Sequence, residues 1–438
     1  MPKQQGLHTT NSTSIDPSSY RMQVTLYSAT GKERDITALV TSYVVTESIF
    51  QQTLMAEIDL NDGVSMMEDL NVTGNEKITV VIRRQNSKTQ SPITLQHDWH
   101  ILDMPLYSRI KPDLQVYKFR CVSNFGLISK FKRVEHAQIG TPTEIIASLY
   151  KEIGVTAELK DSQGLGVIKW IPPRLTYSAA IATVLNRAVA NSGAPFFAYQ
   201  SFSEPNKHVI ASYDSMVGSK EYDRYSQGFF YGNEAQTDAD YEEKRRRILE
   251  VSSNLGFSAY KGLKDGAYVT RTHALDISNK TYTQIDYNAF DTPPPMIDGS
   301  KSELAWNKTF NVSGVSPANL KDTFNIYIAT NELAMSDSGH LNFYNHMPYI
   351  SARKNSVYKN LDQISHSVRL HGDTELSSGK IVELAFPKSG EETPGAGREV
   401  DKLLSGRYLV VSTTHTFNGD GYYTTIKAKR DSVHIRSQ

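Results

Sequence analysis

The sequence predicts an α+β fold that is mainly β, with two antiparallel β-barrel domains separated by a helical insert and a middle α+β region. Three observations lead to this fold class. Apolar and polar residues alternate at both ends of the chain, as half-buried strands require. Two helical patterns follow the first group of strands. The sequence has no internal repeat at the spacing of a solenoid protein.

The last domain, expected over residues 348–438, has the clearest strand pattern. The run Tyr408–Val411 is entirely apolar and predicts a strand that is buried on both faces. The polar turn Asn418–Gly421 joins two strands with residues that tolerate positive φ. A helix over Ala352–Ile364 is expected to lead into this domain. The expected strands are Ser365–His371, Lys380–Phe386, Arg407–Phe417 and Tyr422–Arg430.

The chain begins with polar residues 1–19, which we expect to form a flexible arm. Residues 20–125 form the first predicted β-barrel domain. Its clearest strand places four apolar side chains on one face, namely Leu54, Ala56, Ile58 and Leu60. The other strands are expected at Tyr20–Ser28, Glu76–Arg84, Ile93–Leu102, Met104–Arg109 and Leu114–Val122.

Residues 126–218 are expected to form an α+β insert. Thr141 and Glu144 match a capping box, and Pro142 fits the first helical position between them. Gly154 can end this helix. A second helix is predicted over Tyr177–Asn191. The segments Ala194–Tyr199 and Lys207–Tyr213 then predict a hairpin.

The middle region, residues 219–347, is less regular. Ser219–Asp240 is expected to be a long connection, and Asn254–Gln284 alternates as strands do. Further strands are predicted at Leu304–Val315 and Thr323–Thr330. The run Arg245–Arg247 could bind an anion, but three arginines beside Glu242 and Glu243 more often form a solvated, locally paired surface.

Composition excludes several classes of protein. Lys plus Arg number 47 and Asp plus Glu number 47, so the chain lacks the basic excess of a general nucleic-acid or membrane-surface binder. Cys121 is the only cysteine, which rules out an internal disulfide framework. We expect no secretory signal in the polar N-terminal residues and no membrane insertion by this chain.

Motifs for catalysis are weak, and we assign no catalytic, cofactor-binding or metal-binding residue. Gly372–Lys380 resembles a phosphate loop, but Thr374 replaces the first glycine and Ile381 the final hydroxyl residue, so hairpin turns are the better interpretation. His97 and His100 would lie on opposite faces of a strand, which prevents chelation. Cys121 lies in an alternating strand and is interpreted as a core thiol.

Two segments resemble a known family. Asp35–Gly63 (DITALVTSYVVTESIFQQTLMAEIDLNDG), followed by Val72–Arg83, is similar to the first tube-like domain of the baseplate hub proteins of contractile-tailed bacteriophages. His371–Pro387, Leu403–Phe417 and Tyr422–Ser432 are similar to the second tube-like domain of these proteins. The order of the segments along the chain also fits this family.

The resemblance implies a structural subunit of the phage virion, assembled in the host bacterial cytoplasm. Hub proteins of this family form a homotrimer whose two tube-like domains per subunit offer a pseudo-sixfold surface to the hexameric tail tube. The opposite side carries the trimeric spike, and the family is related to the base of type VI secretion spikes. The resemblance therefore implies a spike partner, a tail-tube or adjoining hub partner, and a neutral or mildly charged channel. It implies no cofactor and no enzyme activity.

Two alternatives remain open at the level of sequence. A carbohydrate- or receptor-binding tail component would need an exposed aromatic platform with converging polar groups, and the 24 tyrosines permit one. A glycan-cleaving enzyme would need two carboxylates that face each other across a cleft.

Overall fold

The structure is a computed structural model of the full chain. It describes residues 16–161, 164, 166–227, 241–256, 258–277, 280–298, 302–304, 319–330, 341–342, 347–389 and 399–434. Most of the expected arm and most of the predicted strand Leu304–Val315 lie outside these residues. Asp16–Ser19, the described part of the arm, contacts the last domain, because the carbonyl of Ser18 accepts a hydrogen bond from the amide of Tyr422 at 2.9 Å.

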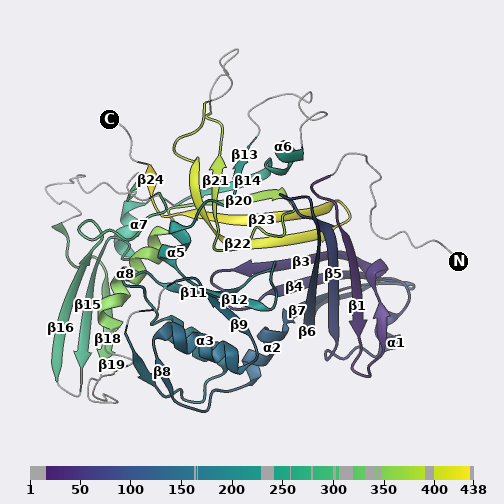
Figure 1. Ribbon diagram of the computed structural model, residues 1–438, viewed down its shortest axis with the longest axis horizontal. Coiled ribbons are helices and arrows are strands. Elements are labelled where there is room, and N and C mark those ends of the chain that lie inside the picture. Colours follow the sequence, from purple (N-terminus) through teal and green to yellow (C-terminus); the bar gives the residue numbers. More distant parts are fainter. Residues whose placement is uncertain are drawn as a thin grey trace.

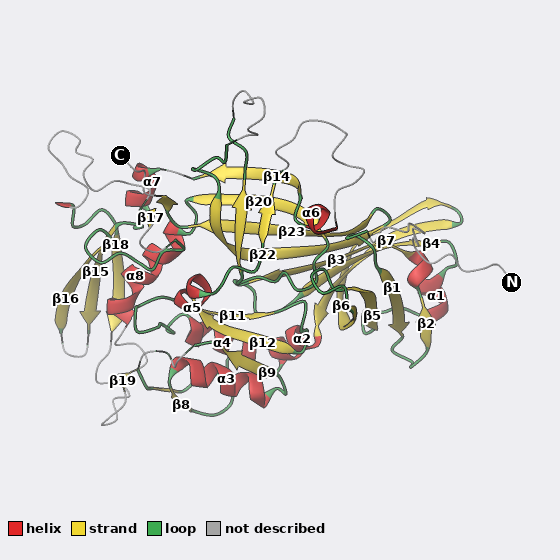
Figure 2. Cartoon of the chain, turned by 45° about the horizontal axis from the view of Figure 1, so that its top comes forward, coloured by secondary structure: helices red, strands yellow, loops and turns green. Residues whose placement is uncertain are grey.

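A long sheet of 13 strands organises the molecule. Eight of its strands follow one another in the order β14-β20-β23-β22-β3-β4-β7-β6, and Figure 2 shows the first four one beneath another. We call β14, β20, β23 and β22 the C-terminal group, and β3, β4, β7 and β6 the N-terminal group. Their bounds are Ile248–Leu255 (β14), Ile364–His371 (β20), Gly421–Arg430 (β23), Gly406–Asn418 (β22), Val40–Ser48 (β3), Met55–Asp62 (β4), Leu114–Ser123 (β7) and Pro92–Lys111 (β6).

The two groups are joined directly by β22 and β3. These strands pair antiparallel from Ser412 opposite Ser48 to Asn418 opposite Ser42. The two segments that resemble separate domains in sequence therefore share one sheet. The turn between β22 and β23 forms as expected, with Gly421 at φ +134°, a conformation that favours glycine.

The side chains that face the core follow the predicted alternation. Leu54, Ala56, Ile58 and Leu60 are all at most 1 % exposed, and Tyr408–Val411 is buried throughout. Next to the N-terminal group, β5 pairs with the first half of β6 and with β1, so the sheet continues beyond β6 on one side. The elements of this extension are β1 (Arg21–Tyr27), β2 (Glu33–Asp35), η1 (Thr37–Leu39), α1 (Met66–Leu70) and β5 (Lys77–Gln85), on the right in Figure 1.

The insert forms a separate α+β layer below the long sheet in Figure 1. Its first predicted helix is confirmed: α3 begins after Thr141, with both hydrogen bonds of the capping box to Glu144. The predicted hairpin is also confirmed as β11 and β12. The elements are α2 (Asn124–Phe131), β8 (Gln138–Gly140), α3 (Pro142–Glu152), β9 (Thr156–Leu159), β10 (Ile168–Trp170), α4 (Tyr177–Leu185), β11 (Phe196–Gln200), β12 (Lys207–Ser212) and α5 (Tyr213–Gly218).

A third layer lies at the left of Figure 1, where α8 packs against a three-stranded sheet in the order β16-β15-β18. This layer comes from the middle region and from the start of the last segment. The elements are β15 (Val269–Asp276), β16 (Thr281–Asn288), β18 (Asn325–Thr330) and α8 (Met347–Asn360). The remaining short elements are β13 (Arg224–Ser226), α6 (Tyr241–Arg245), α7 (Ala259–Lys264), β17 (Ser302–Glu303), β19 (Leu341–Asn342), β21 (Ile381–Ala385) and β24 (Val433–His434).

Several local predictions were wrong. The two strands expected at Ile93–Leu102 and Met104–Arg109 are one strand, β6, whose pairing with β7 is irregular around Pro105. The alternation over Asn254–Gln284 contains a short helix, α7, capped by Ser258. The second helix of the insert ends at Leu185 rather than at Asn191. Helix α8 begins and ends earlier than expected, and Ile364 already belongs to β20.

The predicted fold class, mainly β with antiparallel sheets and a helical insert, is confirmed. The domain boundaries stay predictions, since strands of the first and last segments contribute to one sheet. Among the described residues, no helix is both long enough and apolar enough to cross a bilayer.

Candidate functional site: the two open ends of the long sheet

Within the described residues, the candidate motifs of the sequence have structural roles. His97 and Trp99 are buried while Asp98 and His100 lie on the opposite, partly exposed face, so the two histidines cannot share a ligand. Cys121 is fully buried, and burial raises the pKa of its thiol above the usual range. Within the described residues, no cluster of three or more His, Cys, Asp or Glu side chains could hold a metal ion.

Gly372–Lys380 connects β20 to β21, and these strands do not pair with each other, so the prediction of hairpin turns was wrong. Glycine is instead required at position 372 because the backbone there lies very close to the Tyr422 side chain. A Cβ atom added there would lie 2.0 Å from the ring of Tyr422. The segment therefore packs tightly against β23.

The arginine run divides between core and surface. Arg245 is only 3 % exposed, and its guanidinium contacts Asp223 at 2.6 Å and Glu242 at 2.8 Å. Arg246 is half-exposed and pairs with the same two acids. Local pairing with Glu242 is thus confirmed, but a fully solvated surface is wrong for Arg245, because Asp223 approaches it from the preceding connection.

The first open end is the second half of β6, where the pairing with β5 has stopped. Strand β5 pairs with β6 only from Pro92 to His100, whereas β7 pairs with β6 as far as Lys111. One backbone edge of β6 therefore has no partner strand from about Leu102 onward within the described residues. Large apolar side chains are exposed here, namely Leu102, Leu106, Tyr107 and Ile110, and the last two are 56 % and 60 % exposed.

The second open end is β14. This strand pairs with β20 along one edge from Ile248 to Leu255, and no described strand pairs along its other edge. Leu249 and Leu255 are 40 % and 46 % exposed. An open strand edge with exposed apolar side chains is a template for pairing with another chain, so proteins normally protect such an edge.

The eight strands between these ends alternate in direction without exception. Every neighbouring pair from β14 to β6 is antiparallel. Because eight is an even number, β14 and β6 run in opposite directions. The two open ends are therefore compatible as antiparallel partners in different copies of the chain.

One face of the eight strands is polar and partly exposed, and we call it the wet face. Its centre carries small hydroxyl side chains, namely Ser42, Thr46, Ser412, Thr414, Thr416 and Thr425. On the N-terminal group its charges are paired across strands: Lys118 lies 2.9 Å from Glu57 and 3.4 Å from Asp59. The opposite face is the buried one that packs on the core.

A buried carboxylate marks the junction between the groups. Glu47, on β3, is 1 % exposed and accepts hydrogen bonds from the amides of Phe202 in the insert and Ser378 in the β20–β21 connection. Burial raises the pKa of Glu47 to about 7, although the two amides act in the opposite direction. The carboxylate thus connects three segments that are distant in sequence.

A buried guanidinium makes a second connection. Arg84, on β5, donates to the carbonyls of Gly372 at 2.7 Å and Pro17 at 3.1 Å, and lies 4.8 Å from the centre of the Tyr422 ring. Sequence reasoning missed both Arg84 and Glu47. Each is a charged residue in an alternating strand, and the only available signal was its position on the otherwise apolar face.

Comparison with known proteins identifies the fold as that of phage tail proteins. No protein-family model matches the chain, and no curated relative matches it in sequence. Among solved structures, the chain is similar to the tail protein from Neisseria meningitidis MC58, with a TM-score of 0.52 and 12 % identity over 94 % of this chain and 97 % of that one. It is also similar to the 43 kDa tail protein of prophage MuSo2 from Shewanella oneidensis, with a TM-score of 0.51 and 9 % identity over 94 % and 98 %.

Proposed function

We propose that this chain is a structural baseplate hub subunit of a phage tail, which forms a trimeric ring between a hexameric tail tube and a trimeric spike. The observation that carries the proposal is the run of eight antiparallel strands from β14 to β6, in which β14 and the second half of β6 each have an edge that no described strand pairs with. The shared fold with phage tail proteins supports the setting, a virion assembled in the cytoplasm of a bacterial host.

The directions of the strands are compatible with ring closure. A rotation about an axis roughly parallel to the strands keeps the direction of each strand, so β14 of a rotated copy runs antiparallel to β6. Pairing of these two edges is a heterologous contact, and such a contact closes into a ring when the rotation is correct. Closure removes both exposed edges at once, which gives the ring a physical advantage over the separate chain.

The two groups of strands in each chain would match a ring of three chains to a tube with sixfold symmetry. Each chain contributes two four-stranded groups to the ring, so three chains contribute six groups. A ring of six similar groups can contact a hexameric tube on one side while the threefold arrangement of the chains suits a trimeric spike on the other.

The wet face would line the channel of the ring. The insert and the core clusters pack against the buried face, and these bulky layers fit only on the outside of a closed ring. The channel would then present hydroxyl groups, paired charges and the exposed side chain of Lys427. This surface fits the neutral or mildly charged conduit that the sequence resemblance implies.

One pairing of opposite charges across the two edges involves Glu250, which in its own chain lies 4.0 Å from Arg369. With strand ends aligned, the start of β14 in one copy lies beside the end of β6 in the next. Glu250 would then face the region of Arg109 and Lys111, all of which are exposed. Opposite charges across a strand pair stabilise it and like charges destabilise it.

The mass of the full chain, measured by light scattering after size-exclusion chromatography over a range of concentrations, tests the proposal. We expect a trimer. Glu250→Lys should weaken it, with a cost of about 1 kcal/mol at each interface, and the added changes Arg109→Glu and Lys111→Glu should restore it. Glu68→Lys, at an exposed position of α1 away from both ends, is the matched control. A monomer or dimer at all concentrations, or no rescue by the combined variant, would contradict the proposal.

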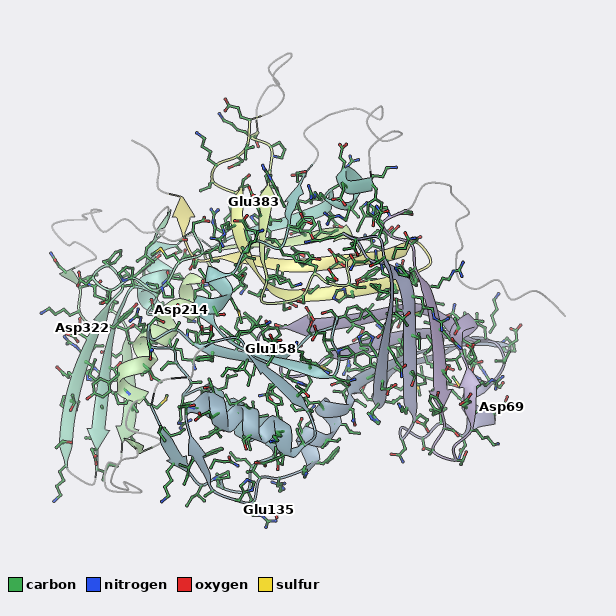
Figure 3. The ribbon with its side chains drawn as sticks, in the orientation of Figure 1. Asp69, Glu135, Glu158, Asp214, Asp322 and Glu383 are labelled. Carbon is green, nitrogen blue, oxygen red and sulfur yellow. The ribbon has the colours of Figure 1, made fainter. Side chains whose placement is uncertain are left out.

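The absence of enzyme activity stays a prediction. Figure 3 shows Asp69, Glu135, Asp322 and Glu383 at separate parts of the molecule, so these four carboxylates do not face one another across a cleft. The alternative role in carbohydrate binding is favoured by one surface, the outer face of the β16-β15-β18 sheet.

A further inference from the structure

The β16-β15-β18 sheet has one covered and one open face. Helix α8 packs on the covered face, where Thr270 and Thr272 are fully buried. The alternate residues of the sheet point the other way. Tyr327 on β18 is 76 % exposed and Tyr282 on β16 is 57 % exposed. This layer forms the left edge of the molecule in Figure 1, remote from the first strand β1.

Three rings form a stack across the open face. His273 on β15 is the direct register partner of Tyr327, and their ring centres are 4.7 Å apart with an interplanar angle of 11°. Tyr282 lies on the other side of His273, at 5.9 Å and 18°. The rings are therefore nearly parallel, and the stack ends at the most exposed ring, Tyr327, on the outer strand β18.

A chain of hydrogen bonds fixes these side chains. Gln284 donates to the hydroxyl of Tyr282 at 2.7 Å, and Tyr282 contacts Nδ1 of His273. Nε2 of His273 donates to Oδ1 of Asn325 at 2.8 Å, because this oxygen can only accept. Exposed side chains normally keep their rotamer freedom in solution. Here four of them are already ordered, so a ligand that contacts them would lose less entropy on binding.

The charges on the same face neutralise one another. Arg271 contacts Asp286 through two hydrogen bonds, of 2.7 Å and 3.0 Å, and lies 3.5 Å from Asp322. A single-stranded nucleic acid would require unpaired cations beside the aromatic rings. Beside the ring stack lie the amide and hydroxyl groups of Asn325, Gln284 and Tyr282, the exposed apolar side chain of Leu275, and the compensated ion pairs of Arg271.

We propose that this outer face binds a neutral saccharide chain. The apolar C–H face of a pyranose would pack on the free side of Tyr327, and its hydroxyl groups would exchange hydrogen bonds with Asn325, Gln284 and the Tyr282 hydroxyl. An open strip of three strands, rather than a closed pocket, suits a linear polymer that extends beyond the site. The site is independent of ring closure, because it uses neither β6 nor β14.

Saturation-transfer NMR on the full chain tests the proposal with three neutral probes, chitohexaose, cellohexaose and maltohexaose. We expect transfer to at least one of them in the wild-type protein. Tyr327→Ala should weaken this binding about tenfold or more, since it removes the ring that the sugar contacts. Tyr260→Ala is the matched control, because Tyr260 is 77 % exposed but lies on α7, outside the stack.

A second variant separates the polar from the aromatic contribution. Gln284→Ala removes one hydrogen-bond partner and leaves all three rings, so it should weaken binding less than Tyr327→Ala does. The proposal is overturned if none of the three hexasaccharides binds the wild-type chain, or if Tyr327→Ala and Tyr260→Ala bind equally well. Loss of self-association in Tyr327→Ala without any saccharide binding would also overturn it, by showing that the face docks protein.

Discussion

The N-terminal and C-terminal groups of the long sheet are built alike but are assembled differently. In the N-terminal group, β3, β4, β7 and β6 all come from the 84 residues between Val40 and Ser123, and the charges on their wet face form pairs such as Lys118 with Glu57. The C-terminal group takes β14 from the middle region, so 108 residues lie between Leu255, the end of β14, and Ile364, the start of β20. Its wet face carries hydroxyl groups together with the basic side chains of Arg369, Lys427 and Lys429.

 The interval between Leu255 and Ile364 contains the whole third layer, including β15, β16, β18 and α8. The difference shows that a four-stranded group can be completed either by neighbouring hairpins or by a strand from a distant segment, provided that the directions alternate.

The junction between the groups needs more than strand pairing. Buried polar residues connect the two groups to each other and to the insert: Glu47 on β3, Arg84 on β5 and His97 on β6 all contact backbone atoms of other segments. Removing one partner of such a contact lowers the free energy of unfolding, because the other polar group stays buried without a hydrogen bond. The following predictions separate this buried junction from the exposed pairs of the wet face.

Acidification should have the largest effect, because both groups and the insert bury neutral histidines. Burial lowers the pKa of His97 to about 4, of His208 to about 3 and of His366 to about 4. The unfolded chain, with an ordinary histidine pKa near 6.5, then binds more protons than the folded chain below that pH. Stability should therefore fall as the pH drops from about 6.5 to about 4, by on the order of 2 kcal/mol for each histidine.

Glu47 acts in the opposite direction over part of this range. Its raised pKa of about 7 means that the folded chain takes up this proton first, so its own contribution to stability increases as the pH falls from about 7 to about 4.5. One carboxylate does not offset three histidines. Urea unfolding midpoints at pH 7.5 and pH 4.5 measure the net effect, and an equal or higher midpoint at pH 4.5 would contradict it.

Glu47→Ala should be the most damaging of the single substitutions. It leaves the buried amides of Phe202 and Ser378 without their acceptor, at a cost of about 3–5 kcal/mol. Glu57→Ala, at a partly exposed position on the adjacent strand β4, is the control and should cost less than about 1 kcal/mol. Urea unfolding measures both. Equal effects of the two substitutions would show that the junction does not depend on the buried carboxylate.

Arg84→Met tests the contact between β5 and the C-terminal segment. The carbonyls of Gly372 and Pro17 would lose a charged donor, with an expected cost of about 2–4 kcal/mol. The neighbouring residue Arg83 is exposed, so Arg83→Met should change stability by less than about 0.5 kcal/mol. If the two variants differ by no more than the error of the unfolding curves, Arg84 does not stabilise the contact between β5 and the C-terminal segment.

Apart from the control variants, Glu57→Gln should have the smallest effect. It removes the ion pairs with Lys118 and Arg120 on the wet face, where both partners are partly exposed, and should cost less than about 1 kcal/mol. The effect should decrease further in high salt, because exposed charges are screened. A loss of several kcal/mol, measured by urea unfolding at low salt, would show that the wet face is a structural core rather than a solvent-facing surface.

The sequence was sufficient where the determining interactions are local. The capping box of Thr141 and Glu144, the β22–β23 hairpin and the alternating side chains of β4 all follow from residues close together in the chain. The pairing of β22 with β3 joins residues more than 360 positions apart and leaves no local pattern. For the same reason, the sequence did not predict the pairing of β14 with β20, and so it did not predict the unpaired edges of β14 and β6.

Other failures came from residues whose environment depends on distant partners. Arg245 looked like a surface residue because Asp223, its buried partner, lies in the preceding connection. Helix α7 was missed because its short sequence interrupts an alternation that continues on either side. The aromatic stack also depends on three strands, since Tyr327 meets His273 only when β18 pairs with β15. No single strand contains this surface.

Disulfide trapping tests the central claim, closure of the sheet between copies, most directly. Paired cysteines would be introduced on the two open edges, combining Tyr107→Cys or Ser108→Cys on β6 with Ser252→Cys or Ser253→Cys on β14. The buried Cys121 should not interfere. After oxidation, denaturing electrophoresis should show dimers and a terminal trimer for at least one combination, and no trimer for any single substitution. Monomers throughout, or a dimer as the terminal product, would contradict a ring closed by β6 and β14.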